Sequence, residues 1–422
     1  MKLFFLGGCL EVGRSSFLVN VGEVRLLFDA GIKLWDHNEL PLMPQAVDAA
    51  ILSHAHLDHS GAVPTLYKHF NIPTFCTSPT IPITSLLLED SMKVAKKRNK
   101  SCYFSGKELK KVDRNFTPLT YGKEYEFFDG TSFKLHEAGH ILGSAQVFLK
   151  SPEGTTLLYT GDIKLKETRT HNGAEAPEEE VNILVIESTY ARAEHPKREE
   201  LEKRFCEEVR GVLDEGGVAI VPCFAVGRTQ EMLGVLHAHR LEGSRGEVYV
   251  DGMGQKINEI YYEFPAYLKN PKALFQAFSE AKNIEYHKQR KKIIERPCVV
   301  ITTAGMLEGG PVLDYVQAIN RRGNGKIFLT GYQVEGTNGR MLLEEGRIKE
   351  NGKVIRLNVP TGFFDFSAHA GRTELIEYAK KLNPNKVFCV HGDMANCNAL
   401  AAELSAQGFD AVAPANGSKH GV

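Results

Sequence analysis

One cluster of potential metal ligands constrains this chain more than any other feature of its sequence. The apolar segment 47–52 predicts a buried strand, and four imidazole or carboxylate residues follow it among the six residues 54–59: His54, His56, Asp58 and His59. Such groups suit zinc-class ions, and each would cost about 1–3 kcal/mol if it were buried without a partner. One loop cannot complete two metal sites, so the fold must bring further ligands to the end of this strand.

The spacing of the cluster divides it between two ions. Alternate residues of an extended segment point to the same side, so His54 and His56 can bind one ion. Asp58 and His59 lie further along the loop and can reach a second. Four further candidates follow other apolar strands, each beside a glycine: His140, Asp162, His391 and Asp393. Each of them alone is equally well explained as a structural residue, but together with the cluster they predict a two-metal centre.

Composition narrows the class of protein without identifying it. The 422 residues are 42% hydrophobic and 24% charged, which is typical of a globular protein with two or three domains. No apolar run approaches the roughly 18 residues that cross a bilayer, and the N-terminus lacks a signal-peptide core, so we expect a cytoplasmic protein with no membrane contact. Eight cysteines without a C-x-x-C pair predict reduced, mostly buried thiols.

The formal charge of −1 provides no long-range basic field, so any binding of RNA or DNA must use local patches. Two basic runs stand out. One is 93–100, with five Lys or Arg in eight residues, and the other is 287–296. We interpret each run as a solvated helix face, with a binding role as the alternative.

Alternating strand and helix patterns predict an α/β fold. Strands are expected at 2–6, 15–21, 24–28, 47–52, 131–136, 145–149, 155–159 and 181–186, and a helix at 81–97. From about residue 195, strands at 218–221, 247–250, 299–302 and 327–329 each run into a glycine-rich junction. This pattern is typical of a parallel, doubly wound layer whose binding edge lies at the strand C-termini. A last strand, 386–390, is expected between helices at 373–381 and 395–406.

These motifs resemble those of a known fold family. The H-x-H-x-D-H segment, the strand-end residue Asp29, His140 and Asp162 resemble four motifs of the metallo-β-lactamase fold. Segments around Glu187, His369 and His391 resemble the extra motifs of its nucleic-acid-cleaving β-CASP branch. The resemblance covers residues 3 to 393. It implies an αββα sandwich, formed by 1–194 and 361–422, with a β-CASP domain inserted at 195–360.

Two segments indicate a subfamily. Arg228-Thr229-Gln230-Glu231 and the F-S-A-H form around His369 resemble the cleavage-and-polyadenylation specificity factor endonuclease type more closely than RNase J. No KH-like G-x-x-G module precedes residue 1, so we expect one of the short archaeal or bacterial members. The resemblance implies a ribonuclease that hydrolyses single-stranded RNA, mainly at internal bonds.

The family pattern also implies a ligand set for two zinc ions per chain. The first ion would be held by His54, His56 and His140. The second would be held by Asp58, His59 and His391. Asp162 would bridge both ions. A metal pair of this kind lowers the pKa of bound water and stabilises negative charge on a phosphodiester.

The remaining motif residues receive supporting roles from the resemblance. His369 is the candidate general acid for the leaving sugar oxygen, and Glu187 would orient its ring and keep it protonated. Both form the predicted catalytic set together with Asp58. Asp29 would orient ligand histidines instead of binding a metal itself.

A phosphate track is predicted in the inserted domain. Gly227 and Arg228 stand at a strand-to-helix junction, where helix N-terminal amides and a guanidinium can bind phosphate. Gly305 and Gly331 could repeat the amide part of this arrangement. Tight turns explain each glycine equally well, but several such loops along one sheet edge favour the track.

Several alternative functions stay open. They are a 5′-to-3′ exoribonuclease of RNase J type, a DNA nuclease, a small-molecule hydrolase of the same fold, and a non-catalytic RNA-processing subunit. A small-molecule hydrolase would leave the insertion, Glu187 and His369 unexplained. Non-catalytic relatives lose metal ligands, whereas every expected ligand type is present here. We expect a homodimer, which could join a larger RNA-processing complex.

Overall fold

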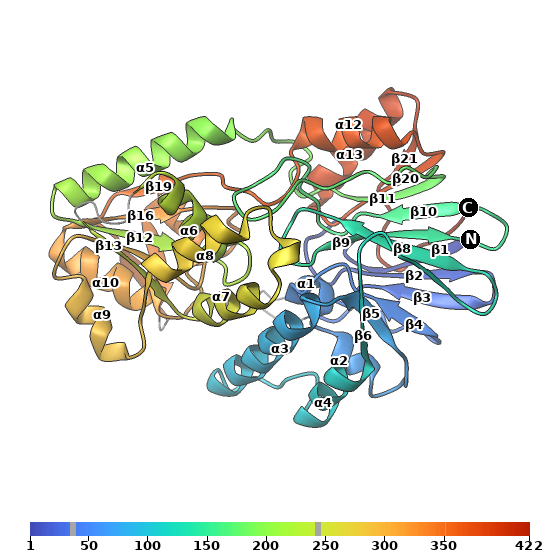
Figure 1. The fold of residues 1–422 in the computed structure, drawn as a ribbon, viewed down its shortest axis with the longest axis horizontal. Coiled ribbons are helices and arrows are strands. Elements are labelled where there is room, and N and C mark those ends of the chain that lie inside the picture. The colour runs from blue at the N-terminus through green and yellow to red at the C-terminus, as the bar shows by residue number, and fades with distance from the viewer. Residues whose placement is uncertain (34–38, 241–245, 351) are drawn as a thin grey trace. The chain divides into compact units, whose positions relative to one another are not determined.

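The computed structural model describes residues 1–33, 39–240, 246–350 and 352–422 (Figure 1). They form two compact units. Unit 1 comprises residues 1–167, 173–194 and 369–422, and unit 2 comprises residues 168–172 and 195–368. The chain therefore leaves unit 1 and returns to it. The domain limits at residues 195 and 360 stay a prediction.

Unit 1 is built on two seven-stranded sheets. The first has the order β22 (Lys419–Gly421), β1 (Lys2–Gly7), β2 (Ser16–Val21), β3 (Val24–Phe28), β4 (Ala49–Ile51), β5 (Thr74–Thr77) and β6 (Phe116–Leu119). The second has the order β21 (Asp410–Val412), β20 (Lys386–Val390), β11 (Ile183–Glu187), β10 (Thr156–Tyr159), β9 (Ala145–Lys150), β8 (Ser132–Glu137) and β7 (Glu124–Glu126).

The two sheets of unit 1 bury their inner faces against each other. Alternating side chains fill this space, among them Phe17, Phe28, Tyr159 and Phe388. Helices cover both outer faces. The first sheet packs on α1 (Leu57–Ser60), α2 (Val63–Leu66), α3 (Thr80–Lys97) and α4 (Gly106–Asn115). The second packs on α12 (Arg372–Leu382) and α13 (Met394–Ala406). The expected αββα sandwich is confirmed.

Unit 2 contains a six-stranded parallel sheet. Its order is β14 (Lys282–Asn283), β13 (Glu247–Asp251), β15 (Cys298–Thr302), β12 (Val218–Pro222), β16 (Gly325–Leu329) and β19 (Thr361–Phe363). The helices between the strands are α5 (Arg198–Asp214), α6 (Arg228–Ala238), α7 (Gly254–Glu263), α8 (Pro271–Glu280), α9 (His287–Ile293), α10 (Val312–Arg322) and α11 (Asn338–Glu345). A hairpin of β17 (Arg347–Glu350) and β18 (Lys353–Arg356) follows. The parallel layer expected after residue 195 is thus present.

The sequence patterns did not predict every helix, nor the bounds of every strand. Helix α4 is rich in lysine, and a capping box between Ser105 and Glu108 begins it. Strand β4 is shorter than the predicted 47–52, although the Leu52 amide still donates to the Phe75 carbonyl. Among the described residues, no helix is long and apolar enough to cross a membrane.

Candidate metal centre

The candidate ligands of unit 1 follow the carboxyl ends of its central strands. Strand β4 runs parallel to β3, and β10, β11 and β20 run parallel to one another. The carboxyl ends of parallel strands meet at one edge of a sheet. Glu187 is the last residue of β11. The loops after these strands, and the loop between β8 and β9, lead into or carry the other site residues: Asp29, the 54–59 cluster, His140, Asp162 and His391.

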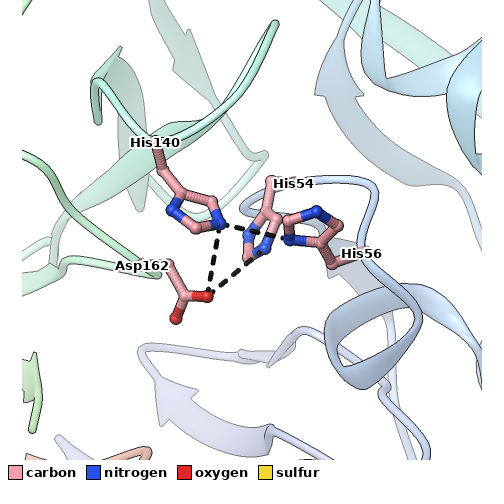
Figure 2. Close-up of side chains that lie close together, drawn as sticks. All are labelled: His54, His56, His140 and Asp162. Carbon is pink, nitrogen blue, oxygen red and sulfur yellow. Dashed lines mark hydrogen bonds and ion pairs between the residues drawn. The ribbon is translucent and has the colours of Figure 1, made fainter. Parts of the chain in front are cut away.

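The first ligand group consists of three imidazoles and one carboxylate, whose donor atoms lie within 4.8 Å of one another: His54, His56, His140 and Asp162. Figure 2 shows these side chains pointing toward a common centre. Nε2 of His140 lies 3.1 Å from Nδ1 of His56. Nε2 of His54 and Nε2 of His140 each lie 3.6 Å from Oδ2 of Asp162. Three nitrogens and one oxygen form the donor set of a tetrahedral zinc-class site.

The second group contains Asp58, His59 and His391. Nε2 of His391 lies 3.8 Å from Oδ2 of Asp58. Oδ1 of Asp162 faces this group, at 3.3 Å from Nε2 of His59 and 3.5 Å from Nε2 of His391. The two oxygens of Asp162 therefore face different groups.

Hydrogen bonding provides a test of whether these residues fit a metal. Nε2 of His54, Nε2 of His59 and Oδ1 of Asp162 are buried and have no hydrogen-bond partner. Buried polar atoms in this state cost about 1–3 kcal/mol each, unless a bound group satisfies them. Their convergence and their nitrogen and oxygen chemistry match a divalent metal. The residues therefore fit the metal cofactor that the sequence predicts.

Asp29, a buried carboxylate, forms hydrogen bonds that position His59 and the loop at Ser53. One oxygen accepts a hydrogen bond from the backbone amide of Ser53 at 2.7 Å. The other lies 2.7 Å from Nδ1 of His59, the Ser53 hydroxyl and the Tyr159 hydroxyl. The sequence analysis did not identify Tyr159, Ser53 or Ser15, whose hydroxyl lies 2.8 Å from Nδ1 of His391. Only the contacts between strands identify these residues.

Close backbone approaches at the centre require two glycines. A Cβ atom at Gly31 would lie 1.6 Å from the carbonyl oxygen of Asp58. Gly161 has a φ of +54°, and its Cβ would lie 2.7 Å from that of Ser53. Any side chain at either position would displace the loops that carry the ligands.

Burial and neighbouring charges shift the pKa values of the residues in the ligand groups. Burial, together with the neighbouring His59, lowers the pKa of His54 well below its ordinary value, and burial lowers the pKa of His56. Burial acts the same way on His59, but the Asp162 and Asp29 carboxylates raise its pKa well above the usual range. Burial raises the pKa of Asp162, but the neighbouring imidazoles outweigh burial and hold that pKa well below its ordinary value. Asp162 is therefore ionised, as a metal ligand must be.

Buried Glu187 and half-buried His369 form a pair beside the first ligand group. Nδ1 of His369 lies 3.0 and 3.1 Å from the two oxygens of Glu187. The ring centroid of His369 is 4.7 Å from that of His140. Burial lowers the pKa of His369, but the carboxylate of Glu187 outweighs burial and raises it. The pair thus favours the protonated form of this imidazole next to the metal ligands.

Glu187 is held in place by the backbone. It is fully buried, and its oxygens accept hydrogen bonds from the amides of Ile163 at 2.8 Å and Thr189 at 3.3 Å. Donor atoms of Asp162, Glu187 and His369 also lie within 4.8 Å of one another. Because both Glu187 oxygens are already engaged with protein donors, this third group is better suited to proton transfer than to metal binding.

The predicted phosphate-binding residues gather at one edge of the unit 2 sheet. Gly305 approaches the loop after β12, where its Cβ would lie 3.0 Å from the backbone of Cys223. A Cβ at Gly331 would lie 3.6 Å from the guanidinium of Arg228. Gly227 precedes α6 with a φ of +79°.

The first amides of α6 are used within the protein. The Arg228 amide donates to the Val226 carbonyl at 3.0 Å, and the Thr229 amide donates to the Phe224 carbonyl at 3.2 Å. A phosphate at this edge would therefore depend on the half-buried Arg228 guanidinium more than on these amides.

Comparison with family models agrees with this architecture. The metallo-beta-lactamase superfamily matches residues 10–201, the Beta-Casp domain matches 229–342, and the Zn-dependent metallo-hydrolase RNA specificity domain matches 355–414. The fold, the ligand groups and these matches define a metal-dependent hydrolase with an inserted β-CASP domain.

Individual relatives specify the family. The chain is 36% identical to Probable RNase MJ4 of Methanocaldococcus jannaschii, over 99% of both chains. It is 36% identical to Transcription termination factor FttA of Methanosarcina mazei, over 96% of this chain and 69% of that protein. It is 34% identical to RNase aCSPSF2 of Saccharolobus solfataricus, over 99% of this chain and 84% of that protein. The chain belongs to this archaeal family of β-CASP proteins with a metallo-β-lactamase fold.

Proposed function

We propose that the chain is a zinc-dependent ribonuclease that cleaves single-stranded RNA, mainly at internal phosphodiester bonds. The observation that carries this proposal is the position of Asp162. Its two oxygens face separate ligand groups, and the Glu187–His369 pair lies next to them. Two relatives over nearly the whole chain are named RNases, which favours RNA as the substrate.

The ligand assignment follows the two groups. His54, His56 and His140 would hold one zinc ion, and Asp58, His59 and His391 a second, with Asp162 shared. Bound zinc would supply an activated water and would stabilise negative charge on the phosphate. Asp29 and Ser15 each hold the Nδ1 side of a ligand histidine, which leaves Nε2 of that ring for the metal.

The proton for the leaving group comes from His369 in this proposal. Breaking the P–O bond leaves an alkoxide, which is a poor leaving group until it takes up a proton. Glu187 occupies Nδ1 of His369, so Nε2 would donate to the leaving sugar oxygen. The raised pKa of His369 keeps the imidazolium form populated near neutral pH.

The site also bears on the alternatives. The β-CASP and RNA specificity models match beyond the metallo-β-lactamase part, which disfavours a small-molecule hydrolase. The presence of both ligand groups disfavours a non-catalytic subunit. RNase J-type trimming from the 5′ end and DNA cleavage are left for experiment. The cytoplasmic location, the homodimer and membership of a larger complex stay predictions.

A circular substrate separates these activities, because it has no end to capture. The purified protein is depleted of metal, reloaded with zinc, and incubated with a circular RNA, the same RNA in linear form with a 5′-monophosphate, and the equivalent DNA circle. We expect the RNA circle to be opened only by the metal-loaded protein. Survival of the circle with degradation of the linear RNA to mononucleotides would identify an exonuclease. Cleavage of the DNA circle alone would identify a DNA nuclease.

A further inference from the structure

Helices α3 and α4 of unit 1 carry a concentration of positive charge that the metal centre does not use. Residues 93–114 contain nine Lys or Arg and two Asp or Glu, a formal charge of +7, whereas the whole chain has −1. Lys111 is half-buried, and the other eight cations are exposed. These eight form the α3–α4 basic patch: Lys93, Lys96, Lys97, Arg98, Lys100, Lys107, Lys110 and Arg114.

Part of this charge is not neutralised locally, although Lys93 pairs with Glu89 at 3.7 Å. Of the two carboxylates in the segment, Glu108 closes the capping box of α4, and Asp113 accepts a hydrogen bond from the Ser85 hydroxyl at 3.2 Å. Four lysines have no carboxylate within 4.0 Å among the residues that the structure describes: Lys96, Lys97, Lys107 and Lys110. Like charges one helical turn apart disfavour a helix by about 0.2–0.5 kcal/mol per pair, so the patch opposes the stability of its own helices.

The second basic run of the sequence provides a contrast. On α9, Arg290 pairs with Asp251 at 2.7 Å and with Asp314 at 2.8 Å, and His287 lies 3.2 Å from Asp314. These pairs attach α9 to neighbouring elements of unit 2, as expected of a structural helix face. Part of the run 287–296 is therefore paired within unit 2, whereas Lys96 and Lys97 of the run 93–100 are exposed and have no carboxylate within 4.0 Å among the described residues.

The position of α3 connects the patch to the metal centre. Thr77 at the end of β5 and Thr80 at the start of α3 donate hydrogen bonds to the carbonyl of Gly143 at 2.6 and 3.2 Å. Gly143 lies in the loop that carries His140, and α1, which carries Asp58 and His59, packs against α3 (Figure 1). From Thr80 to Lys97 the helix rises by about 26 Å. One end of α3 thus lies at the catalytic loops and the other end lies in the patch.

An exposed aromatic ring accompanies the charges. Tyr103, in the connection between α3 and α4, is 36% exposed. Its carbonyl accepts a hydrogen bond from the Lys68 ammonium, which secures the connection to the body of unit 1. Cations interleaved with an exposed ring can bind both the phosphates and the bases of a single strand.

We propose that the α3–α4 basic patch binds the phosphate backbone of the RNA substrate outside the scissile region. A strand that occupies the metal centre would continue along α3 and exchange its counterions for the lysines and arginines of the patch. This inference rests on the proposed ribonuclease function, and it adds a binding surface to that function. It implies that RNAs long enough to span α3 bind more tightly than short ones.

A charge-neutral variant and a matched control test the proposal. The patch variant is Lys96→Gln, Lys97→Gln, Lys107→Gln and Lys110→Gln in one chain. The control removes the same charge from the exposed part of the other run, with Lys288→Gln, Lys291→Gln, Lys292→Gln and Arg296→Gln. Binding of a short and a long single-stranded RNA is measured against salt concentration on the full chain without metal. Thermal melts verify that both variants remain folded.

We expect the patch variant to bind the long RNA about tenfold more weakly. The slope of log affinity against log salt should become shallower by about 1–3, since each lost phosphate contact contributes about 0.7. The loss should be smaller for the short RNA, and the control should behave like the unmodified protein.

Three outcomes would overturn the inference. If the patch variant and the control lose RNA affinity equally, the loss is an effect of net charge and not of the patch. An unchanged salt slope would leave the patch without an RNA contact. A loss of binding to anionic vesicles or to an acidic peptide, with RNA binding intact, would assign the patch to another partner. Failure of the proposed function is distinguishable, because the unmodified, zinc-loaded protein would then cleave no RNA of either length.

Discussion

Two clusters of ionisable residues in this chain differ in whether their buried polar atoms have hydrogen-bond partners. In the metal centre of unit 1, Nε2 of His54, Nε2 of His59 and Oδ1 of Asp162 are buried without a hydrogen-bond partner. In unit 2, both oxygens of Glu231 and both oxygens of Glu202 accept hydrogen bonds from protein donors. Both clusters contain buried and charged residues, but of the two only the first has these buried polar atoms without a hydrogen-bond partner.

The unit 2 cluster is a closed network. Glu231 pairs with Arg198 and accepts hydrogen bonds from the Arg169 and Thr170 amides at 3.0 and 3.1 Å. Arg169 also pairs with Glu202 at 2.5 Å. Burial raises the pKa of Glu231, but Arg198 and these donors outweigh burial and lower it. A network that satisfies itself stabilises a fold, whereas converging unsatisfied atoms indicate a ligand.

Substitution of the shared carboxylate should have the largest effect. For Asp162→Ala we expect RNA cleavage to fall by more than the roughly 10⁴-fold attributable to one acid–base residue. Bound zinc should also decrease, because both ligand groups lose an oxygen. Cleavage assays and elemental analysis measure both quantities. Asp393→Asn is the matched control, since Asp393 also follows a strand but caps α13, and Asn can replace it as a cap. Near-normal turnover with two bound zinc ions would contradict the dinuclear assignment.

Removal of the imidazole at His369 should separate chemistry from metal binding. We expect His369→Ala to retain its zinc and its RNA affinity while its cleavage rate drops by about 10²–10⁴-fold. Single-turnover rates, metal content and equilibrium RNA binding are compared in one preparation. If zinc is lost together with activity, His369 is a metal ligand and the proton-donor role is wrong.

A substitution within the closed network should lower the free energy of unfolding. Glu231→Ala removes the acceptor of the Arg169 and Thr170 amides, while half-buried Arg198 keeps its pair with Glu202, and we expect the free energy of unfolding to fall by about 1–3 kcal/mol. Denaturant titration measures the change, and metal content of the folded protein should stay at its normal value. Glu344→Ala, which removes an exposed ion pair with Arg340, should cost no more than about 1 kcal/mol. Loss of zinc in folded Glu231→Ala protein would undermine the distinction between the two clusters.

The smallest effect is expected at the unit 2 sheet edge. If Arg228 contacts a phosphate, Arg228→Ala should weaken RNA binding and reduce the salt slope by about 0.7. Arg228→Lys keeps the charge and should preserve most of the slope. Identical slopes for all three proteins would make Arg228 a structural residue that supports the loop at Gly331.

Predictions from the sequence succeeded where a pattern repeats over several residues. Strands Val24–Phe28 and Lys386–Val390 have the predicted bounds, because both are apolar runs that end beside glycine or a charged residue. Helix α4 was missed, since lysines cover most of its surface and its capping box is the main local signal. Strands β5 and β6, at one end of the first sheet, were also missed, because they are too short for a clear periodicity.

In the candidate site, too, the sequence predicted some residues and missed others. Histidines and aspartates at strand ends are visible in the sequence, because few other roles explain so many potential ligands beside glycines. Tyr159, Ser53 and Ser15 carry no such signal, since single hydroxyl residues occur throughout any chain. Their contacts with Asp29 and His391 join residues as far as 376 positions apart. Pairing of distant strands, and not local spacing, decides such contacts.

The sequence by itself determined the α/β class, the identity of the potential metal ligands and the position of two basic runs, because each depends on local residue type and spacing. The family resemblance implied a shared Asp162 and a Glu187–His369 pair, and the tertiary structure added which oxygen of Asp162 faces which ligand group and how closely Glu187 approaches His369. The tertiary structure also decided that Arg290 of α9 pairs with Asp251 and Asp314, while lysines of the α3–α4 basic patch face solvent. Which group satisfies a buried or charged atom depends on segments far apart in the chain, and that information arises only when they pack together.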